Sequence, residues 1–505
     1  MILRHRMMAT CLCVVVLTAP LLSNSAQPVT PNASPEAKAL LNFVSSLSGK
    51  YTLTGQHNYP NTRDRNSQFA SRYIGETPAV WSTDMGFAED GDTDSYLARP
   101  DIVEEAIRQH HLGSLVTICW HAVPPTANEP VTFRPLPEAS PDSLASVQGQ
   151  LTDQQFRDVL TPGTPLYQQW CNQVDSVAFY LKKLQKAHLP VLWRPYHEMN
   201  GAWFWWGGRL GPYGTRALYR QLFDRLVTHH KLDNLVWVWS VDRPNHPNMY
   251  FSHYYPGTDY LDILALDVYG NDFNQTYYDS LLVLSNGKPL TLGEVGNPPT
   301  PDILQQQPGW IFWVIWAGMV RNTTKEQHHA LVRDARILSL EDSAYVVLTG
   351  PYRAACQLPS LNFVKSARRF SGKWQLNEGK CQADSWGLGQ AAYQMSLDLR
   401  DDILDVRKAF IVEWGDDRFE KETYVLDGTP VESIMWNAPQ ITTSSWSGDT
   451  LVFNSRITFN RGDQAFETTN REFWFLEEEG RCLKIRQVSR SFRGNRDVML
   501  VYEKE

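Results

Sequence analysis

Between residues 51 and 318 the chain repeats one pattern, in which a short apolar run ending in polar or aromatic residues precedes a stretch of helical periodicity. Most of these runs are continuously apolar, as expected of parallel strands that are buried on both faces. We predict strands at residues 51–57, 79–84, 114–121, 190–198, 235–242, 263–269, 289–295 and 310–316. We predict helices in several of the gaps, at residues 101–110, 167–186, 215–230 and 325–338. This alternation indicates an α/β fold, the (β/α)8 TIM barrel, to which we assign residues 36–350.

The predicted strands end in side chains that are suited to chemistry. In a (β/α)8 barrel the active site lies at the C-terminal ends of the strands. Here those ends carry His57, Asp84, His121, Glu198, Asp242, Tyr269, Glu294 and Trp316. The segment 123–163, rich in Pro, Ser and Gln, follows the third strand. We expect it to be a long loop that shapes a substrate cleft.

Beyond residue 350 the alternation stops, and we predict a linker at residues 351–369 and a second domain at residues 370–505. In this domain short runs alternate with period two and are separated by Gly-Asp, Asp-Gly and similar turn signals. Strands of this kind without long helices indicate an all-β antiparallel barrel or sandwich. The opening residues, Phe370-Ser-Gly-Lys-Trp374, are similar to those of lipocalin-like barrels. The alternatives are a carbohydrate-binding sandwich that presents Trp436 or Trp446, or a domain that only packs against the first.

The N-terminus predicts export. Basic residues at positions 4–6 precede an apolar run at 11–22 and small polar residues at 23–26, which is the order of a secretory signal peptide over residues 1–26. The apolar run is short for a permanent membrane anchor, so we expect a secreted protein, periplasmic or extracellular. Five cysteines remain after residue 26; they show no C-x-x-C spacing, so we predict no zinc site. Export permits disulfides, and we expect Cys381 to pair with Cys482.

Composition narrows the class of partner. The formal net charge of −8 argues against nucleic acid or an anionic membrane surface. Aromatic residues make up 12% of the chain and include 18 Trp, which is more than a core needs and suits carbohydrate binding. A neutral polysaccharide is therefore the expected partner, although any single Trp outside the motifs is expected to fill the core.

One segment joins a carboxylate to these aromatics. Glu198 ends an apolar run between Arg194 and His197 on one side and a tryptophan cluster on the other. A carboxyl group surrounded by aromatic rings can hold its proton near neutral pH, as an acid catalyst of glycoside cleavage requires.

A second carboxylate lies where that chemistry needs it. Glycosidic hydrolysis uses two carboxyl groups on opposite sides of the scissile bond. Glu294 ends the seventh predicted strand and Glu198 ends the fourth, and these strands face each other across the mouth of a closed eight-stranded barrel. This geometry can bring the two groups to the roughly 5 Å spacing of a retaining mechanism.

These residues resemble a known family. The segment Arg194-Pro-Tyr-His-Glu-Met-Asn-Gly-Ala-Trp-Phe-Trp-Trp-Gly207, together with Gly293-Glu-Val-Gly296, looks like glycoside hydrolase family 26 over residues 40–345. That family consists mainly of retaining endo-β-1,4-mannanases with catalytic glutamates on strands four and seven. By this resemblance Glu198 is the general acid/base and Glu294 the nucleophile.

The resemblance also implies five substrate-binding residues and one supporting residue. Tyr269 would hydrogen-bond Glu294 and hold it ionised, and His197 would contact the glycone sugar. The others are His121 as a sugar contact, Trp203 as a platform on the leaving-group side, Trp316 as the floor of the cleavage subsite and Arg194 as a structural tie. The sequence departs from the family after His121, where Ala122-Val-Pro-Pro125 follows. The choice between cleavage of internal bonds and cleavage at chain ends is therefore left open.

The sequence thus predicts a secreted, monomeric, retaining mannanase that cleaves internal β-1,4-mannosidic bonds of mannan, galactomannan or glucomannan without a cofactor or metal. A same-family β-1,3/1,4-glucanase or xylanase is the first alternative. The second is a polysaccharide-binding protein without turnover, although retention of both Glu198 and Glu294 argues against it.

Overall fold

The computed structural model describes residues 26–505, apart from 87–97, 130, 136–139, 141–143, 362–369 and short gaps in the last domain. Those gaps are 386, 389–390, 401–402, 413–414, 436, 448–449, 462–463, 478–479 and 492–493. All but the last residue of the expected signal peptide, and Trp436, thus lie outside the described residues. Among the helices of the described part, none combines the length and the apolarity that crossing a membrane would require.

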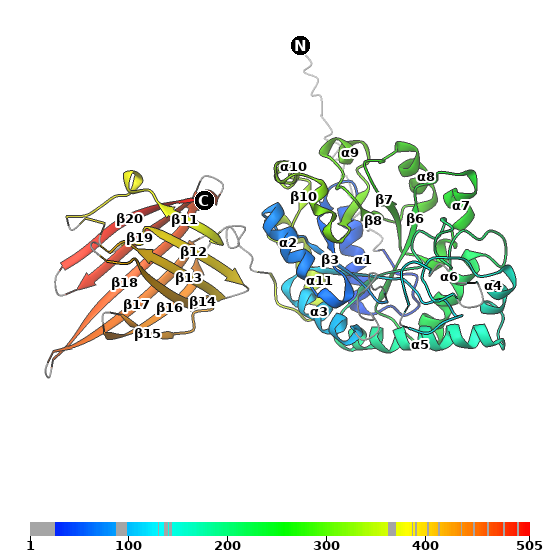
Figure 1. The fold of residues 1–505 in the computed structure, drawn as a ribbon, viewed down its shortest axis with the longest axis horizontal. Coiled ribbons are helices and arrows are strands. Elements are labelled where there is room, and N and C mark those ends of the chain that lie inside the picture. The colour runs from blue at the N-terminus through cyan, green and yellow to red at the C-terminus, as the bar shows by residue number, and fades with distance from the viewer. Residues whose placement is uncertain are drawn as a thin grey trace, which may run out of the picture.

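Parallel strands close into a barrel, as predicted (Figure 1). They are β1 (Thr52–Leu53), β2 (Gly55–His57), β3 (Val80–Asp84), β4 (Leu115–Trp120), β5 (Val191–Pro195), β6 (Leu235–Asp242), β7 (Ile263–Val268), β8 (Leu290–Val295), β9 (Trp310–Ile315) and β10 (Ile337–Leu338). The first predicted strand is divided at Thr54 into β1 and β2, and the short β10 pairs with β1. Closure comes from β9, which pairs with β8 on one side and with β1 and β2 on the other.

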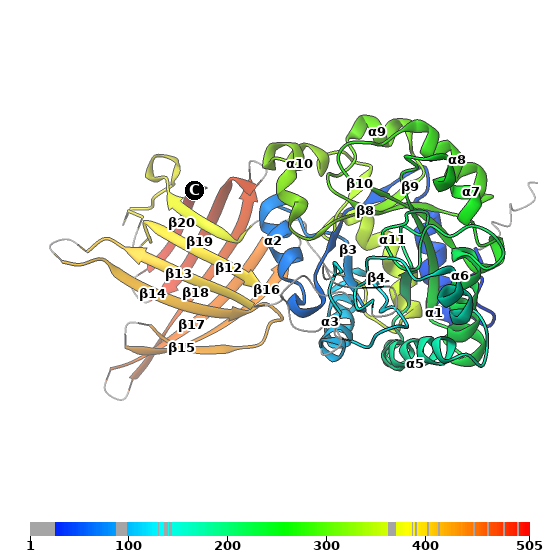
Figure 2. The same cartoon turned by 45° about the vertical axis from the view of Figure 1, so that its right-hand side comes forward.

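Helices surround the strands (Figures 1 and 2). The α-helices are α1 (Pro35–Leu47), α2 (Arg65–Ile74), α3 (Arg99–Leu112), α4 (Asp153–Val159), α5 (Pro165–Lys186), α6 (Thr215–Phe223), α7 (Phe251–Tyr254), α8 (Gln275–Ser285), α9 (Pro301–Gln306), α10 (Lys325–Leu331) and α11 (Ser343–Ala355). The 3-10 turns near the barrel are η1 (Pro60–Thr62), η4 (Pro247–Met249), η5 (Thr258–Tyr260) and η6 (Ala317–Asn322), and the π-helical η3 (Asp224–His229) continues α6. Threonine caps start several of them; Thr164, for example, accepts a hydrogen bond from the backbone N–H of Tyr167.

Some predicted boundaries differ from the structure. The helix expected at 325–338 ends at Leu331, and residues 337–338 belong to β10 instead. The segment 123–163, expected to be a loop, contains α4, whose start is fixed by a capping box between Thr152 and Gln155. At the other end of the domain, α11 runs past residue 350 to Ala355 and packs on α1, with the rings of Phe43 and Tyr352 stacked at 6.1 Å.

Most tryptophans of the barrel domain fill its core. Fully buried indoles stand on β3, β5, β6 and β9, at Trp81, Trp193, Trp237, Trp239 and Trp310. Two indoles of the motif after β5, Trp205 and Trp206, are fully buried as well. Trp203 remains partly exposed, so among the tryptophans of this motif it is the one that can offer its ring face to a sugar.

The last domain is a second, all-antiparallel β domain, also as predicted. Its strands are β11 (Gly372–Leu376), β12 (Gln394–Arg400), β13 (Ile403–Phe410), β14 (Arg418–Val425), β15 (Val431–Met435), β16 (Ala438–Ser447), β17 (Thr450–Arg461), β18 (Gln464–Glu477), β19 (Cys482–Ser491) and β20 (Gly494–Lys504), with the 3-10 turn η8 (Glu378–Lys380) after β11. Neighbours in sequence pair throughout except β14 and β15, and the first strand, β11, pairs with the last, β20. This is the connectivity of an up-and-down barrel rather than of two stacked sheets.

Side chains in the interior of this domain divide into an apolar and a polar layer. Trp374 is fully buried and donates its indole N–H to the carbonyl of Phe370 at 2.8 Å. Further along the strands, Lys408 Nζ lies 2.7 Å from Glu422 Oε2. Burial opposes the charge of Lys408, but the Glu422 and Glu472 carboxylates outweigh it and raise the lysine pKa.

One expectation for this domain fails. Cys381 and Cys482 form no disulfide. Cys381 Sγ accepts the backbone N–H of Val501 at 3.2 Å, and Cys482 pairs with Glu503 in the sheet. Trp446, which the sandwich alternative would present to a polysaccharide, is only partly exposed. It packs edge-on against Phe370 with ring centroids 5.6 Å apart.

Candidate active site

The two carboxylates predicted to be catalytic meet at the C-terminal mouth of the barrel. Glu294 lies in β8, and Glu198 follows β5. One carboxylate oxygen from each of Glu198, Asp267 and Glu294 lies within 4.8 Å of the other two. Retaining glycosidases separate their carboxyl groups by about 5 Å, and inverting enzymes separate them by about 6.5–9.5 Å. The close approach of Glu198 and Glu294 is compatible with the shorter of these two spacings.

The backbone that carries Glu198 is strained. The strand predicted to end at Glu198 ends at Pro195, and both Tyr196 and Glu198 adopt a positive φ, of 49° and 48°. Each such residue costs about 1–3 kcal/mol and is held only where its surroundings fix it. Asn200 supplies that fixation, because its amide donates to the carbonyl of Asp242 at 2.6 Å and accepts the Asp242 N–H at 2.7 Å. The strained turn aims Glu198 into the mouth of the barrel.

Glu294 receives a hydrogen-bond donor on each of its oxygens. The Tyr269 hydroxyl donates to Oε2 at 2.6 Å, and the Arg194 guanidinium donates to Oε1. His197 Nε2 lies 3.7 Å from the same Oε1. The neighbouring Gly293 must be glycine, because an added Cβ would lie 2.6 Å from Asp267. These donors fix one carboxylate orientation, which is what attack on an anomeric carbon requires.

Asp267 is the member of the site that the sequence analysis missed. Arg194 Nη1 lies 3.0 Å from its Oδ2, and the Ser240 hydroxyl donates to the same oxygen at 2.9 Å. Burial raises the pKa of Asp267, the Arg194 guanidinium opposes this by favouring the carboxylate, and the Glu294 charge adds to the rise. Strand alternation offered a signal, because Asp267 lies two residues before Tyr269 and so faces the same side.

Glu198 has the opposite electrostatic environment. Burial raises its pKa well above the usual range, and the charges of Glu294, Asp267 and Asp242 raise it further. The Trp203 indole N–H, which donates to Glu198 Oε2 at 2.6 Å, opposes this by favouring the charged form. The two carboxyl groups therefore have different surroundings, as the acid and the nucleophile of a glycosidase do.

Arg194 is the shared counter-ion of this cluster. Replacing Arg194 by Met should lower the free energy of unfolding by about 3 kcal/mol or more, because Glu294 and Asp267 would lose their common cation inside the protein. Guanidinium denaturation of the barrel, followed by tryptophan fluorescence, measures the change. Adding Asp267→Asn to this variant should restore about 1 kcal/mol by removing one stranded carboxylate. A double variant less stable than Arg194→Met would contradict the shared role.

Three histidines lie behind the carboxylates. His121 Nδ1 lies 2.5 Å from Asp84 Oδ2, and the His197 ring meets the His121 ring edge-on at 4.3 Å. His57 stacks under Trp316 at a centroid distance of 3.9 Å. Burial lowers the pKa of His57 to about 3, so this ring is neutral and supports the indole by packing. The stacking role of His57 could not be read from its position at a strand end alone.

A cleft of about 700 Å³ brings the predicted residues together. It is lined by Tyr59, His121, Phe133, Arg134, Gln148, His197, Glu198, Trp203, Phe204, Asp242, Arg243, Tyr269, Glu294 and Trp316. Every residue expected to bind substrate is in this set, whereas Arg194 lies beneath it, bonded to Glu294. Phe133, Arg134 and Gln148 come from the segment 123–163, so that segment does shape the cleft.

Two buried clusters of the described residues have the spacing of metal ligands. In the first, Cys119 donates its S–H to Asp84 at 3.0 Å, and burial and the Asp84 charge raise the pKa of that thiol well above its usual range. A protonated thiol is a poor ligand. In the second, formed by Glu198, Asp267 and Glu294, the Arg194 guanidinium already holds two of the three carboxylates. The donor sets thus favour hydrogen bonding over metal coordination.

A model of Glycosyl hydrolase family 26 matches residues 29–339. The chain belongs to this family. Curated relatives include a mannan endo-1,4-beta-mannosidase of Thermothelomyces thermophilus, 33% identical over 304 residues, which are 58% of this chain and 58% of the relative. Another is a mannan endo-1,4-beta-mannosidase of Bacillus subtilis strain 168, 27% identical over 331 residues and covering 60% of this chain and 84% of the relative.

Solved structures of family 26 proteins match the barrel in the same way. GH26A from Muricauda sp. MAR_2010_75 superimposes with a TM-score of 0.57 at 41% identity, covering 62% of this chain and 98% of that one. The Podospora anserina GH26-CBM35 beta-(1,4)-mannanase superimposes with a TM-score of 0.53 at 29% identity, covering 66% and 72%. The chain spans about half the length of the first curated relatives, and the family match ends at residue 339, before the antiparallel domain.

Proposed function

We propose that the protein is a retaining endo-β-1,4-mannanase. The observation that carries the proposal is the carboxylate pair at the barrel mouth, in which Glu294 is held by Tyr269 and Arg194 while Glu198, within 4.8 Å, keeps its proton. The printed names of the family 26 relatives, mannan endo-1,4-beta-mannosidases, support mannan as the substrate.

The proposed mechanism has two displacement steps. Glu294 attacks the anomeric carbon and forms an ester with the sugar, while Glu198 transfers its proton to the departing glycosidic oxygen. Glu198, now a carboxylate, then takes a proton from water as the water oxygen attacks the same carbon. The ester bond to Glu294 breaks, and both side chains return to their starting states.

Aromatic surfaces on either side of the pair position the sugars. Trp316, supported from below by His57, would stack under the sugar whose bond is cleaved. Trp203 stands beside Glu198 as a platform for the departing sugar. His121 and His197 line the same cleft and would contact sugar hydroxyls.

Hydrolysis of β-mannan, mixed-linkage β-1,3/1,4-glucan and xylan should be compared side by side. We expect reducing ends from mannan and galactomannan at a rate at least tenfold above that from the other polymers, with a rapid fall in viscosity because internal bonds are cut. Proton NMR of the first products should show the β-anomer, as retention requires. Faster cleavage of glucan or xylan than of mannan would contradict mannan as the substrate. Release of single sugars without loss of viscosity would contradict endo action. Binding of mannan without release of reducing ends would support the non-catalytic alternative.

Export and the monomeric state belong to the same proposal. The expected signal at residues 1–26 supports secretion, and an N-terminus near residue 27 on protein recovered outside the cytoplasm would test it. Light scattering at assay concentration would test the monomer.

A further inference from the structure

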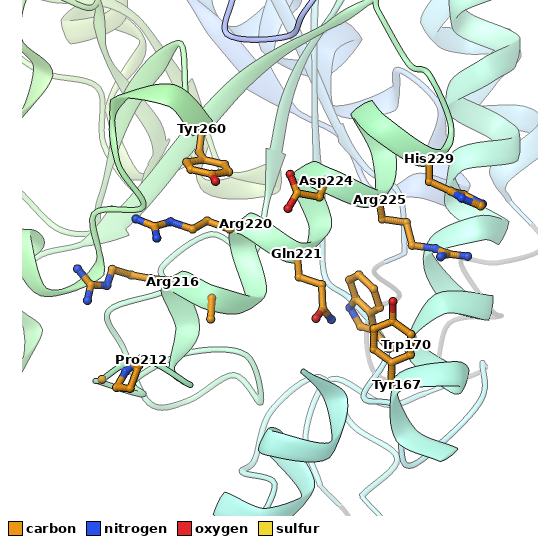
Figure 3. A pocket seen from close by; sticks show the side chains of 12 residues that line it. Tyr167, Trp170, Pro212, Arg216, Arg220, Gln221, Asp224, Arg225, His229 and Tyr260 are labelled. Atoms are coloured by element: carbon orange, nitrogen blue, oxygen red, sulfur yellow. The ribbon is translucent and has the colours of Figure 1, made fainter. Parts of the chain in front are cut away.

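A second cavity, of about 800 Å³, lies on the outer surface of the barrel domain. None of its lining residues lines the catalytic cleft. It is lined by Tyr167 and Trp170 of α5, by residues 211–212, 216–217 and 220–221 at and before α6, by the η3 residues Asp224, Arg225 and His229, and by Tyr260 of η5 (Figure 3). Its volume is within the range of small-molecule sites.

One side of this groove carries two arginines. Arg216 and Arg220 are four residues apart on α6, so they share a helix face, and like charges at this spacing disfavour a helix by a few tenths of a kcal/mol. Arg220 is held in place, because its Nε donates to the Pro256 carbonyl at 2.6 Å and its guanidinium lies 5.1 Å from the Tyr260 ring centroid. Arg216 makes no hydrogen bond or ion pair with any residue that the structure describes. Both guanidinium groups lie on the same side of the groove in Figure 3.

A carboxylate, that of Asp224, lies between the two sides of the groove and forms no ion pair with Arg220. Asp224 is four residues after Arg220, the spacing of a helical ion pair, yet no such pair forms because Arg220 turns to Tyr260. Burial raises the pKa of Asp224. Asp224 also begins the π-helical η3. Such turns are rare in proteins as a whole, and those that occur are often found at functional sites.

The other side of the groove is aromatic and rigid. Tyr167 and Trp170 belong to α5, and the Trp170 indole N–H donates to the Tyr196 hydroxyl at 3.0 Å. Arg225 is neutralised by Asp175, to which it makes two hydrogen bonds, of 2.8 and 2.7 Å. The uncompensated positive charge of the groove therefore lies at Arg216 and Arg220.

We propose that this groove is a second saccharide site, and that its ligand is an oligosaccharide bearing a uronate carboxylate. The Arg216 and Arg220 guanidinium groups would hold the carboxylate, since arginine forks match carboxylate geometry. Asp224 would accept sugar hydroxyls, and the aromatic rings of Tyr260 and Tyr167 would face the sugar rings. An inorganic anion would use only the arginines, and a neutral glycan would leave both charges uncompensated. The proposal rests on the proposed function only in taking polysaccharide as the natural ligand.

Calorimetry on the full chain carrying Glu294→Ala tests the site without turnover. The probes are a xylan-derived aldotetraouronic acid, mannohexaose and sodium sulfate. We expect the aldotetraouronic acid to bind, and to bind at least tenfold more weakly when Arg216→Ala and Arg220→Ala are added. Arg72→Ala, an exposed arginine on α2, is the matched control and should leave the affinity unchanged. Raising the NaCl concentration should weaken this binding, because exposed charges are screened.

Mannohexaose separates this proposal from the proposed function. It should bind the parent and the double-arginine variant equally, through the catalytic cleft. Failure of mannohexaose to bind either protein would contradict the proposed function of the cleft and leave the groove proposal unaffected. Aldotetraouronic acid that does not bind the parent, or binds unchanged after loss of both arginines, would overturn the groove proposal. Equal binding of sulfate would reduce it to an anion site and overturn the saccharide assignment.

Discussion

Glu294→Ala should lower the turnover of β-1,4-mannan by about 10⁴-fold or more, which corresponds to about 5.5 kcal/mol of transition-state free energy. The reason is that Glu294 Oε2 and Oε1 are fixed by Tyr269 and Arg194 in one orientation, and no other described carboxylate of the cleft is held in this way beside Glu198. Initial rates of reducing-end release from galactomannan measure the effect. Glu326→Ala, which removes an exposed carboxylate on α10, is the matched control and should retain full rate.

Chemical rescue distinguishes a lost nucleophile from a damaged fold. In Glu294→Ala the missing carboxylate leaves space beside the anomeric carbon, and sodium azide can enter and attack in its place. With an aryl mannoside that has a good leaving group, azide should restore turnover and yield the α-mannosyl azide, because a single displacement inverts the β-linkage. Near-normal activity of the variant without azide would show that Glu294 is not the nucleophile, and so would a β-configured azide product.

Signals that are local in sequence located most of the barrel and most of its site. Most of the strands are continuous apolar runs, so the pattern of apolar residues located β3 to β9, and the strand ends then supplied Glu198 and Glu294. The prediction of a helix at 325–338 was wrong at its C-terminal end because it also used only local signals. Its periodicity continues into residues 337–338, but pairing with β1, about 280 residues earlier in the chain, makes them a strand.

Contacts between strands were beyond the sequence analysis. The salt bridge of Asp267 with Arg194 joins β7 to β5, and the stacking of His57 under Trp316 joins β2 to the end of β9. Both depend on register and side-chain direction, which a single sequence does not determine. The same gap explains the Cys381–Cys482 error, because spacing along the chain does not reveal which neighbour each thiol meets.

Glu198→Ala should be selective for the leaving group. Hydrolysis of mannan should fall about 10³-fold or more, because no other described group is placed to protonate the departing oxygen. A dinitrophenyl mannoside, whose leaving group needs no proton, should still form the ester to Glu294 rapidly. Breakdown of that ester should then be slow, because the base is missing, so a burst of dinitrophenol should precede slow turnover. Stopped-flow absorbance measures the burst, and equal losses on both substrates would contradict the acid/base role.

The pH dependence of the rate tests the acid/base role of Glu198 through the groups that shift its pKa. Only protonated Glu198 can donate, and its raised pKa keeps it protonated above the usual range of a glutamate. The rate constant kcat/KM should therefore be lost on the basic side, as pH rises through that pKa. Trp203→Phe removes a donor to the charged form and should move this basic limb to higher pH. Asp242→Asn removes a nearby negative charge and should move it to lower pH. Opposite displacements are expected only if Glu198 governs the limb, so a limb that moves the same way in both variants, or persists in Glu198→Ala, would assign it to another group.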